Sequence, residues 1–499
     1  MARNLTSTFL LLALLMAGSL RAQQLVLPGD NPDPSVVKIG DTYWASATTS
    51  NWAPVYPLFR SKDLVNWKQE GTIFKEPPAW ADYYFWAPEI TYEKGKVYVY
   101  YTAHKKDGNL CVAVASADKP EGPYTDHGPL ICQEVGSIDA FPMRDENGKL
   151  QIIWKEDANS VGKPTPIWIS EMNEERTALI GEKKELFRNS EAWEENLVEG
   201  VSMIRHGDYF YAFYAAAGCC GPGCTYVSGV ARSKSLSGPW EKYRGNPILS
   251  SSDQWKCPGH GTPVQKDGRF YFLYHAYEAK GGVFAGRQGL LQEFDFTPDG
   301  WVRFIPGNSG KNKGPVSITD DFKGKTLSDL WQWSVFQKPD FTLKKGQLLL
   351  GANATTAGAF VAQKTYTGSY TAGVKLLVSA STAEAGIAAI GEDKNLVSTT
   401  LAGDTLRLSV IREGNPVFLL ERTIPVKDVL SLRMEVKNGK DLRFLYSLNG
   451  KDFKVLNDEL IEGSFLPPWD RAVRAGLISK GAESKRSAFD DFYIRSAAE

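Results

Sequence analysis

The segment Gly207-Asp208-Tyr209-Phe210-Tyr211-Ala212-Phe213-Tyr214 places a glycine turn directly before a strand of aromatic and aliphatic residues. The same plan recurs at four other positions, namely residues 40–44, 95–101, 148–154 and 268–274. The five glycines follow one another at steps of 55, 53, 59 and 61 residues. Period-2 alternation predicts strands at these positions, and no long segment with a 3.6-residue period interrupts them. The chain is therefore predicted to repeat one all-β unit five times.

A second predicted strand follows each copy, as in Ile167-Trp168-Ile169-Ser170 and Val230-Ala231-Arg232-Ser233. Five units of about 57 residues, each with room for four short strands, are typical of a five-bladed β-propeller. A run of sandwich domains would need roughly a hundred residues per unit and fits less well. We expect the propeller to occupy residues 23–310.

The pattern changes near residue 310. Residues 307–315 are rich in turn formers and predict a linker. Beyond it, strands recur without the repeat period, which favours a single β-sandwich of jelly-roll type over residues 316–499. That part contains no Cys and no His, so any chemistry that needs histidine is expected in the propeller. Because the linker is short, we expect the sandwich to pack against the propeller and to support a wall of its pocket.

The composition favours a globular protein and excludes some function classes. Hydrophobic residues make up 42% and charged residues 23% of the chain, and the net charge is -1. A nucleic-acid-binding surface is not expected at this charge balance, because no basic excess is present. The 14 Trp and the 12% of aromatic residues favour flat-sided sites that stack on sugar rings.

The N-terminus, residues 1–22, has the pattern of a signal peptide. Arg3 precedes a ten-residue apolar run at 9–18, and small residues precede an expected cut before Gln23. The run is too short to span a bilayer, and no later stretch is long enough, so no membrane span is expected. We predict an exported protein, periplasmic or secreted.

Six cysteines, an even number, suit an oxidising compartment. Cys219-Cys220-Gly221-Pro222-Gly223-Cys224 resembles a metal knuckle, but no second pair of Cys or His lies close in the sequence. A local disulfide that braces this loop is favoured over free thiols, with the pairing of Cys219, Cys220 and Cys224 left open.

One polar or aromatic residue precedes each repeat glycine by seven to nine positions. These residues are Asp33, Trp86, Asp139, Glu199 and His260. The strand before the hairpin turn of a propeller blade is the innermost one, so its start faces the axis. The five side chains would then form one pocket with three carboxylates and one indole face. Clustered carboxylates repel, which keeps one protonated while another is ionised, as glycosidic hydrolysis requires.

Each of these residues also has a purely structural interpretation. Asp33 and Asp139 could be turn residues, Glu199 a charge at a strand edge, Trp86 a core residue, and His260 a donor to a backbone carbonyl. The shared position in one repeat favours the functional interpretation, because independent turn residues would not produce it.

In these motifs the sequence resembles glycoside hydrolase family 43, whose members are five-bladed propellers. Asn31-Pro32-Asp33-Pro34-Ser35, Ser137-Ile138-Asp139 and Val198-Glu199-Gly200 are similar to the segments that hold the family's three acidic residues. Trp86-Ala87-Pro88, Gly259-His260-Gly261 and Arg287 also resemble family segments near the pocket. The resemblance covers residues 28–305, and the C-terminal part resembles the concanavalin-A-like domain of many members. One departure is Ala140, where many relatives have Pro.

The resemblance implies an inverting hydrolase that acts on arabinofuranosyl or xylosyl linkages of plant cell-wall oligosaccharides or polysaccharides. Asp33 would be the general base and Glu199 the general acid. Asp139 would orient substrate and raise the pKa of Glu199 by like-charge repulsion. Trp86, His260 and Arg287 would contact substrate. No cofactor is required, although the resemblance allows a Ca²⁺ ion on the propeller axis near His260.

Alternatives remain open from the sequence. A fructan-cleaving propeller is disfavoured because its motifs are absent, and a lectin-like propeller would not need both Asp33 and Glu199. The sandwich could be a carbohydrate-binding module beside a scaffold propeller, and a family member acting on galactan or arabinan chains also fits. Insertions at 50–58, 75–85 and 217–226 favour a closed, exo-acting pocket. The sequence does not decide which sugar is released.

Overall fold

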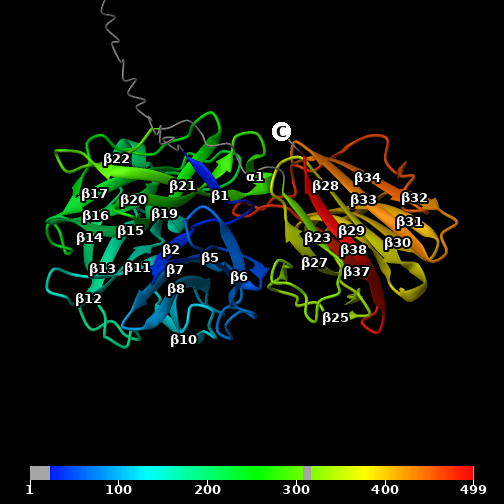
Figure 1. Cartoon of the computed structure of the whole chain (residues 1–499), viewed down its shortest axis with the longest axis horizontal. Coiled ribbons are helices and arrows are strands. Elements are labelled where there is room, and N and C mark those ends of the chain that lie inside the picture. The colour runs from blue at the N-terminus through cyan, green and yellow to red at the C-terminus, as the bar shows by residue number, and fades with distance from the viewer. Residues whose placement is uncertain (1–22, 307–315, 498–499) are drawn as a thin grey trace, which may run out of the picture.

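The computed structural model describes residues 23–306 and 316–497, which form two all-β domains side by side (Figure 1). The predicted signal peptide at 1–22 and the predicted linker at 307–315 lie outside the described residues. The short helical segments in the described ranges are α1 (Gly282–Ala285), η1 (Ala158–Val161), η2 (Ala192–Glu194) and η3 (Val378–Ala380). None of the helices in the described ranges is long and apolar enough to cross a membrane.

The first domain consists of five antiparallel sheets, as the repeat predicts. The first sheet contains β2 (Ser35–Ile39), β3 (Thr42–Ser46), β5 (Val55–Ser61) and β6 (Trp67–Phe74). The second contains β7 (Trp86–Glu93), β8 (Lys96–His104), β9 (Leu110–Ala117) and β10 (Thr125–Ile131). The third contains β11 (Ser137–Arg144), β12 (Leu150–Glu156), β13 (Pro166–Glu171) and β14 (Lys184–Arg188). The fourth contains β15 (Val198–His206), β16 (Tyr209–Ala216), β17 (Val227–Ser233) and β18 (Glu241–Lys242). The fifth contains β19 (Trp255–Lys266), β20 (Arg269–Glu278), β21 (Arg287–Phe296), β22 (Val302–Phe304) and β1 (Gln24–Leu27).

The first strands of the five sheets form a closed ring. β2 contacts β7 and β19, β11 contacts β7 and β15, and β15 contacts β19. The N-terminal strand β1 joins the fifth sheet by pairing with β21, with Leu25 opposite Leu290. This arrangement confirms the five-bladed propeller and surrounds one axis with the strands that start at the predicted site residues.

A repeated backbone irregularity turns these strand starts toward the axis. At one corresponding position in each blade the residue has a positive φ, namely Asp33 (51°), Ala87 (44°), Asp139 (56°), Gly200 (61°) and His260 (26°). In the last four blades the strand register also shifts at this point. Bulges of this kind re-aim side chains and recur beside active sites.

Two packed antiparallel sheets form the second domain, which matches the predicted sandwich. The larger sheet contains β25 (Phe341–Lys344), β26 (Gln347–Gly351), β38 (Arg486–Ser496), β28 (Tyr370–Leu377), β33 (Val429–Lys437), β34 (Asp441–Ser447) and β35 (Lys454–Val455), with β23 (Ser317–Asp320) and β36 (Ile461–Glu462) at its edges. The smaller contains β27 (Ala359–Lys364), β37 (Arg474–Lys480), β29 (Glu384–Glu392), β30 (Asn395–Ala402), β31 (Thr405–Arg412) and β32 (Asn415–Thr423). Leu432, Phe444 and Phe489 from one sheet and Ile387 and Leu477 from the other are buried in a common core.

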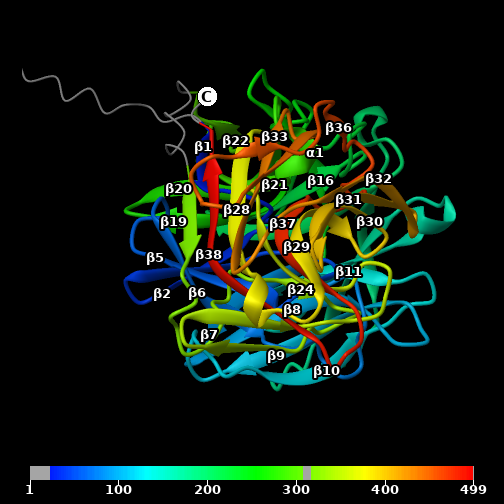
Figure 2. The ribbon, with the colours of Figure 1, turned by 90° about the vertical axis from the view of Figure 1, so that its right-hand side faces the viewer.

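The sandwich, which lies in front of the propeller in the view of Figure 2, packs directly on it, as we expected. β24 (Trp333–Ser334) of the second domain pairs with β4 (Trp52–Ala53) of the first. Beside this pair, the buried Arg474 Nη2 of the sandwich lies 3.0 Å from the buried Asp30 Oδ2 of the propeller. The two domains therefore share a backbone pairing and a buried ion pair.

Substituting Arg474→Met should destabilise the whole chain, because Asp30 then remains buried without its partner. Breaking a buried pair from one side typically costs about 3–5 kcal/mol of unfolding free energy. As a control, Arg303→Met removes the exposed 2.8 Å pair with Asp295 and should cost less than about 1 kcal/mol. Urea unfolding, followed by tryptophan fluorescence, measures the stability of both variants. Equal transition midpoints for Arg474→Met and Arg303→Met would contradict this account of the interface.

Candidate active site

One cavity of about 430 Å³ opens at the propeller axis, within the size range of small-molecule sites. All six residues that the sequence predicted line it, namely Asp33, Trp86, Asp139, Glu199, His260 and Arg287. They come from all five blades; the first five lie at or next to the repeated irregularity, and Arg287 begins β21 of the fifth blade. The sequence prediction that these residues meet is confirmed.

Asp33 is held as an ionised carboxylate. Thr48 Oγ1 donates to its Oδ2 at 2.7 Å, and Arg287 Nη1 lies 3.4 Å from its Oδ1. Burial alone would raise the pKa of Asp33, but Arg287, His275 and His260 together hold that pKa far below its ordinary value. Asp33 can therefore accept a proton from water without first losing one itself.

Glu199 has two close partners that the sequence analysis did not identify. The buried Lys155 Nζ donates to its Oε2 at 2.6 Å, and the Tyr226 hydroxyl donates to its Oε1 at 2.8 Å. Burial alone would raise the pKa of Glu199, but Lys155 and Tyr226 lower it below its ordinary value. This differs from the expectation that Asp139 would raise the pKa of Glu199, because the nearby ammonium outweighs the neighbouring carboxylate.

The raised pKa belongs instead to Asp139. Burial is the main cause, and repulsion by Glu199 and Asp33 adds to it while His260 opposes it, which gives a pKa of about 6. The backbone N–H of Gly200 donates to Asp139 Oδ2 at 2.9 Å and so connects it to the strand start that carries Glu199. The three carboxylates thus include one that takes up a proton near pH 6.

His260 lies between two of the carboxylates. Its Nδ1 is 3.6 Å from Asp33 Oδ1 and 3.9 Å from Asp139 Oδ2. The ring also packs against the backbone of Gly200, where a Cβ atom would come within 2.7 Å of His260 Cγ. Only glycine fits this close approach at a positive φ, so Gly200 determines where the imidazole sits.

Trp86 forms part of an aromatic wall to which the sandwich contributes. Its ring stacks on Tyr84 with centroids 4.3 Å apart, and Trp469 of the sandwich meets it edge-on at 5.8 Å. The indole Nε1 of Trp86 donates to Asp470 Oδ2 at 3.1 Å and to Ser50 Oγ at 3.2 Å. Trp469 and Asp470 themselves line the cavity. The expectation that the sandwich supports a pocket wall is confirmed.

Arg287 connects the base to the second domain. While Nη1 faces Asp33, Nη2 donates to the backbone carbonyl of Asp470 at 2.9 Å. The guanidinium is buried, so its planar fork has one orientation in which both contacts form.

A Ca²⁺ ion on the propeller axis, which the family resemblance allows, would need ligands among the side chains near the histidines. In the described ranges, no group of three His, Cys, Asp or Glu side chains could hold a metal ion. The Nε2 atom of His275 is fully buried without a hydrogen-bond partner. Because His275 Nδ1 accepts the backbone N–H of Asp33 at 3.0 Å, the neutral ring carries its proton on Nε2, which then has no free lone pair for a cation. His275 is therefore no better a ligand than His260, and the Ca²⁺ ion on the propeller axis stays a prediction.

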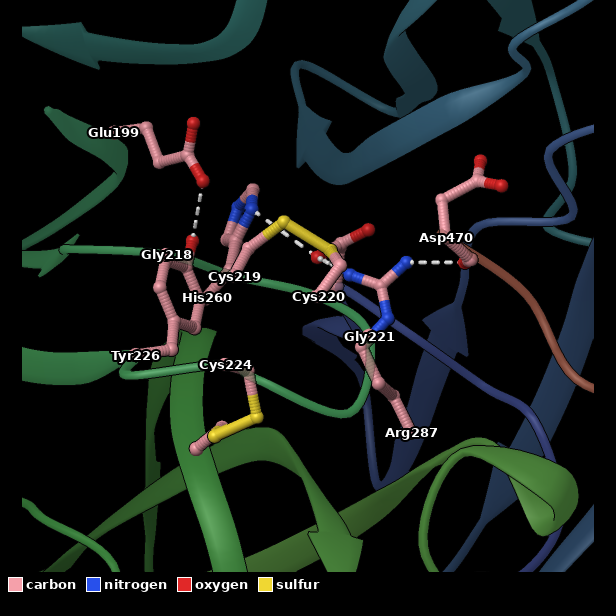
Figure 3. Close-up of a disulfide and its surroundings, with 12 residues drawn as sticks. Glu199, Gly218, Cys219, Cys220, Gly221, Cys224, Tyr226, His260, Arg287 and Asp470 are labelled. Carbon is pink, nitrogen blue, oxygen red and sulfur yellow. Dashed lines mark hydrogen bonds and ion pairs between the residues drawn. A yellow bond between two sulfur atoms is a disulfide. The ribbon is translucent and has the colours of Figure 1, made fainter. Parts of the chain in front are cut away.

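All six cysteines are paired, so the preference for disulfides over free thiols is confirmed. Cys219 is bonded to its neighbour Cys220, Cys224 is bonded to Cys257 at the start of β19, and Cys111 is bonded to Cys132. Figure 3 shows the first two bonds beside the cavity. Of the two disulfides in the 217–226 loop, Cys219–Cys220 is thus local, and Cys224–Cys257 connects the loop to the blade that carries His260.

Sequence reasoning missed the residues that surround the predicted ones. Lys155, Tyr226, His275, Thr48 and Asp470 belong to this group. Only Lys155 carried a signal, since it is a charged residue in the otherwise apolar run Ile152-Ile153-Trp154 of a predicted strand. The others come from elements whose approach to the axis depends on the fold.

The arrangement suits acid–base chemistry at a sugar. Asp33 and Glu199 lie on blades separated by the fifth blade, with β19 between β2 and β15. Two carboxyl groups on different sides of one cavity can serve as the base and the acid that hydrolysis of a glycosidic bond needs.

Comparisons with known proteins agree with this geometry. The sequence-family model "Glycosyl hydrolases family 43" matches residues 22–302. A second family model, "Beta xylosidase C-terminal Concanavalin A-like domain", matches residues 319–467. The non-reducing end alpha-L-arabinofuranosidase BoGH43B of Bacteroides ovatus is 25% identical over 84% of this chain and 82% of its own length. A beta-xylosidase of Bacillus subtilis is 28% identical over 57% of each chain, so the match spans little more than half of that relative.

A solved structure supports the fold of both domains together. The GH43 BlXynB protein from Bacillus licheniformis superposes with a TM-score of 0.80 over 96% of this chain and 100% of its own, at 24% identity. The family resemblance seen in the sequence is confirmed. Because its family model covers more than half of the chain, this protein belongs to glycosyl hydrolase family 43 and is an O-glycosyl hydrolase.

Proposed function

We propose that this hydrolase removes arabinofuranosyl or xylosyl units from the ends of plant cell-wall oligosaccharides or polysaccharides, with inversion at the anomeric carbon. The observation that carries the proposal is that one cavity holds an ionised Asp33, the carboxyl group of Glu199 and Asp139, whose pKa is raised to about 6. The names of the relatives from B. ovatus and B. subtilis support the two sugar classes.

The walls of the cavity support exo action. Trp469 and Asp470 of the sandwich and Cys219 and Cys220 of the 217–226 loop all line the cavity from outside the blade strands. A cavity bounded by such additions accepts a chain end more readily than the middle of a polymer.

In the proposed mechanism, Asp33 removes a proton from a water molecule that attacks the anomeric carbon. Glu199 donates a proton to the leaving oxygen on the opposite face. Asp139 repels the charge of Glu199 and so opposes the influence of Lys155, which on balance holds the pKa of Glu199 below its ordinary value. Inversion requires room for water between acid and base, with carboxyl groups about 6.5–9.5 Å apart.

We also propose that the protein is exported. Residues 1–22 have the composition of a signal peptide, and the mature part contains three disulfides. Disulfides persist in oxidising compartments and are rare in the cytosol.

The first test is a panel of aryl α-L-arabinofuranoside, β-D-xyloside and β-D-galactoside substrates. We expect hydrolysis of one or both pentosides, and proton NMR of the earliest product should show the anomeric configuration opposite to that of the substrate. Preference for the galactoside would favour a galactan-directed enzyme. Binding without hydrolysis would favour a lectin-like protein, and a retained configuration would exclude Asp33 as a base acting on water.

The roles of the two carboxylates can be separated by substitution. Asp33→Asn and Glu199→Gln should each lower kcat by about 10²–10⁴-fold, the usual contribution of a general acid or base. A dinitrophenyl glycoside, whose leaving group needs no proton, should partly rescue Glu199→Gln but not Asp33→Asn.

Asp41→Asn is a matched control for these two variants, because it removes a carboxylate whose side chain is 87% exposed. It should keep full activity, and thermal melting curves should show that all three variants are folded. Equal rescue of both site variants by the activated substrate would contradict the assigned roles.

The pH profile tests the part played by Asp139. Without the Asp139 charge, Lys155 dominates and the pKa of Glu199 falls, so the acid loses its proton at a lower pH. In Asp139→Asn the alkaline limb of kcat/KM should therefore move down by about one pH unit, and in Lys155→Met it should move up. An unchanged limb in Asp139→Asn would show that this residue does not tune the acid.

A further inference from the structure

The disulfide between the adjacent residues Cys219 and Cys220 lies on the wall of the active-site cavity. Both cysteines line the same cavity as Asp33, Glu199 and His260. In the view of Figure 3, the two sulfur atoms lie between the imidazole of His260 and the guanidinium of Arg287, the groups that flank Asp33. The bond therefore forms part of the wall of the cavity that also holds the general base.

Fixed contacts hold the loop that carries this disulfide. The bond from Cys224 to Cys257 attaches the loop to β19. Gly221 N–H donates to the Tyr277 hydroxyl at 3.3 Å, and the Gly218 N–H donates to Thr225 Oγ1 at 3.0 Å. The surface that the two sulfurs present is consequently held in place by other bonds.

A bracing role does not account for the bond between neighbours in the sequence. A disulfide stabilises mainly by closing a loop in the unfolded chain, and the effect grows with loop length. Cys219 and Cys220 are separated by one position, so their bond closes no loop of consequence. The Cys224–Cys257 bond, which spans 33 positions, already connects this loop to the fifth blade.

The chemistry of the bond suits contact with the carbon-bound hydrogens of a sugar. Sulfur is polarisable, makes favourable dispersion contacts and forms only weak hydrogen bonds. The neighbouring groups Asp33, His260 and Arg287 are polar and suited to hydroxyl groups. A sugar ring has both kinds of surface, and the disulfide supplies an apolar surface next to these polar groups.

We propose that the Cys219–Cys220 disulfide is a sugar-binding platform that packs on the apolar face of the glycosyl unit held beside Asp33. This inference rests on the proposed function, since it assumes that a sugar occupies the cavity. The platform adds binding in the ground state and the transition state alike, so it should affect KM more than kcat.

The first test compares two double variants that each remove one disulfide. Cys219→Ala with Cys220→Ala should raise KM for the preferred pentoside about tenfold, which corresponds to about 1.4 kcal/mol. In this variant kcat should stay within about twofold, because uniform binding leaves the chemical step unchanged. The control, Cys111→Ala with Cys132→Ala, removes a disulfide outside the cavity lining and should keep KM. An unchanged KM in a folded first variant, or equal effects of the two variants, would overturn the platform.

A second measurement on the unaltered protein covers the case in which the first variant does not fold. Dithiothreitol reduces a disulfide to two thiols while it is itself oxidised to a cyclic disulfide, and iodoacetamide then labels the thiols. Saturating D-xylose or L-arabinose should slow labelling of Cys219 and Cys220 but not that of the exposed Cys132, as read by peptide mass spectrometry. Absence of protection by a sugar that calorimetry shows to be bound would overturn the proposal.

The two proposals fail in distinguishable ways. If the unaltered enzyme cleaves no pentoside, the proposed function fails, and the labelling experiment alone decides whether the disulfide contacts a sugar. If the enzyme cleaves pentosides and Glu199→Gln is inactive while the platform variant keeps its KM, only the platform fails.

Discussion

The contact between Arg287 and Asp33 is the interaction on which the site depends. The guanidinium lies 3.4 Å from the carboxylate and is the strongest influence that keeps Asp33 ionised against its burial. The same side chain donates to the Asp470 carbonyl of the second domain. The ionisation of the base and the position of the sandwich are thus connected through one buried cation.

Charge balance determines which carboxylate holds the proton. Asp33 has Arg287 and two histidines as neighbours, and Glu199 has Lys155 in direct contact. For Asp139, the influence of His260 and Lys155 does not outweigh its burial and two like charges. Three acidic side chains at equivalent positions of a repeat therefore titrate differently. The repeat provides the positions, and the non-repeating neighbours provide the differences in pKa that acid–base catalysis requires.

The walls of the cavity likewise combine residues of the repeated blades with residues from segments outside the repeat. The blade strands place the acidic groups, whereas Trp469 and Asp470 of the sandwich and the disulfide of the 217–226 loop enclose them. Additions of this kind lie outside the repeat, so they can change substrate choice without disturbing the ring of inner strands.

Arg287 was indicated only by the family resemblance, but the amino-acid sequence alone determined the all-β class, the five repeats and the other five residues that meet at the axis. It could do so because a strand repeat puts equivalent residues at equivalent places, and the axis brings those places together. The contacts of Lys155 and Tyr226 with Glu199, the pairing of Cys219 with Cys220 and the approach of Asp470 were decided by tertiary structure. They join residues tens to hundreds of positions apart, or choose among alternatives that the sequence left open, and no local pattern encodes distances between different blades or domains.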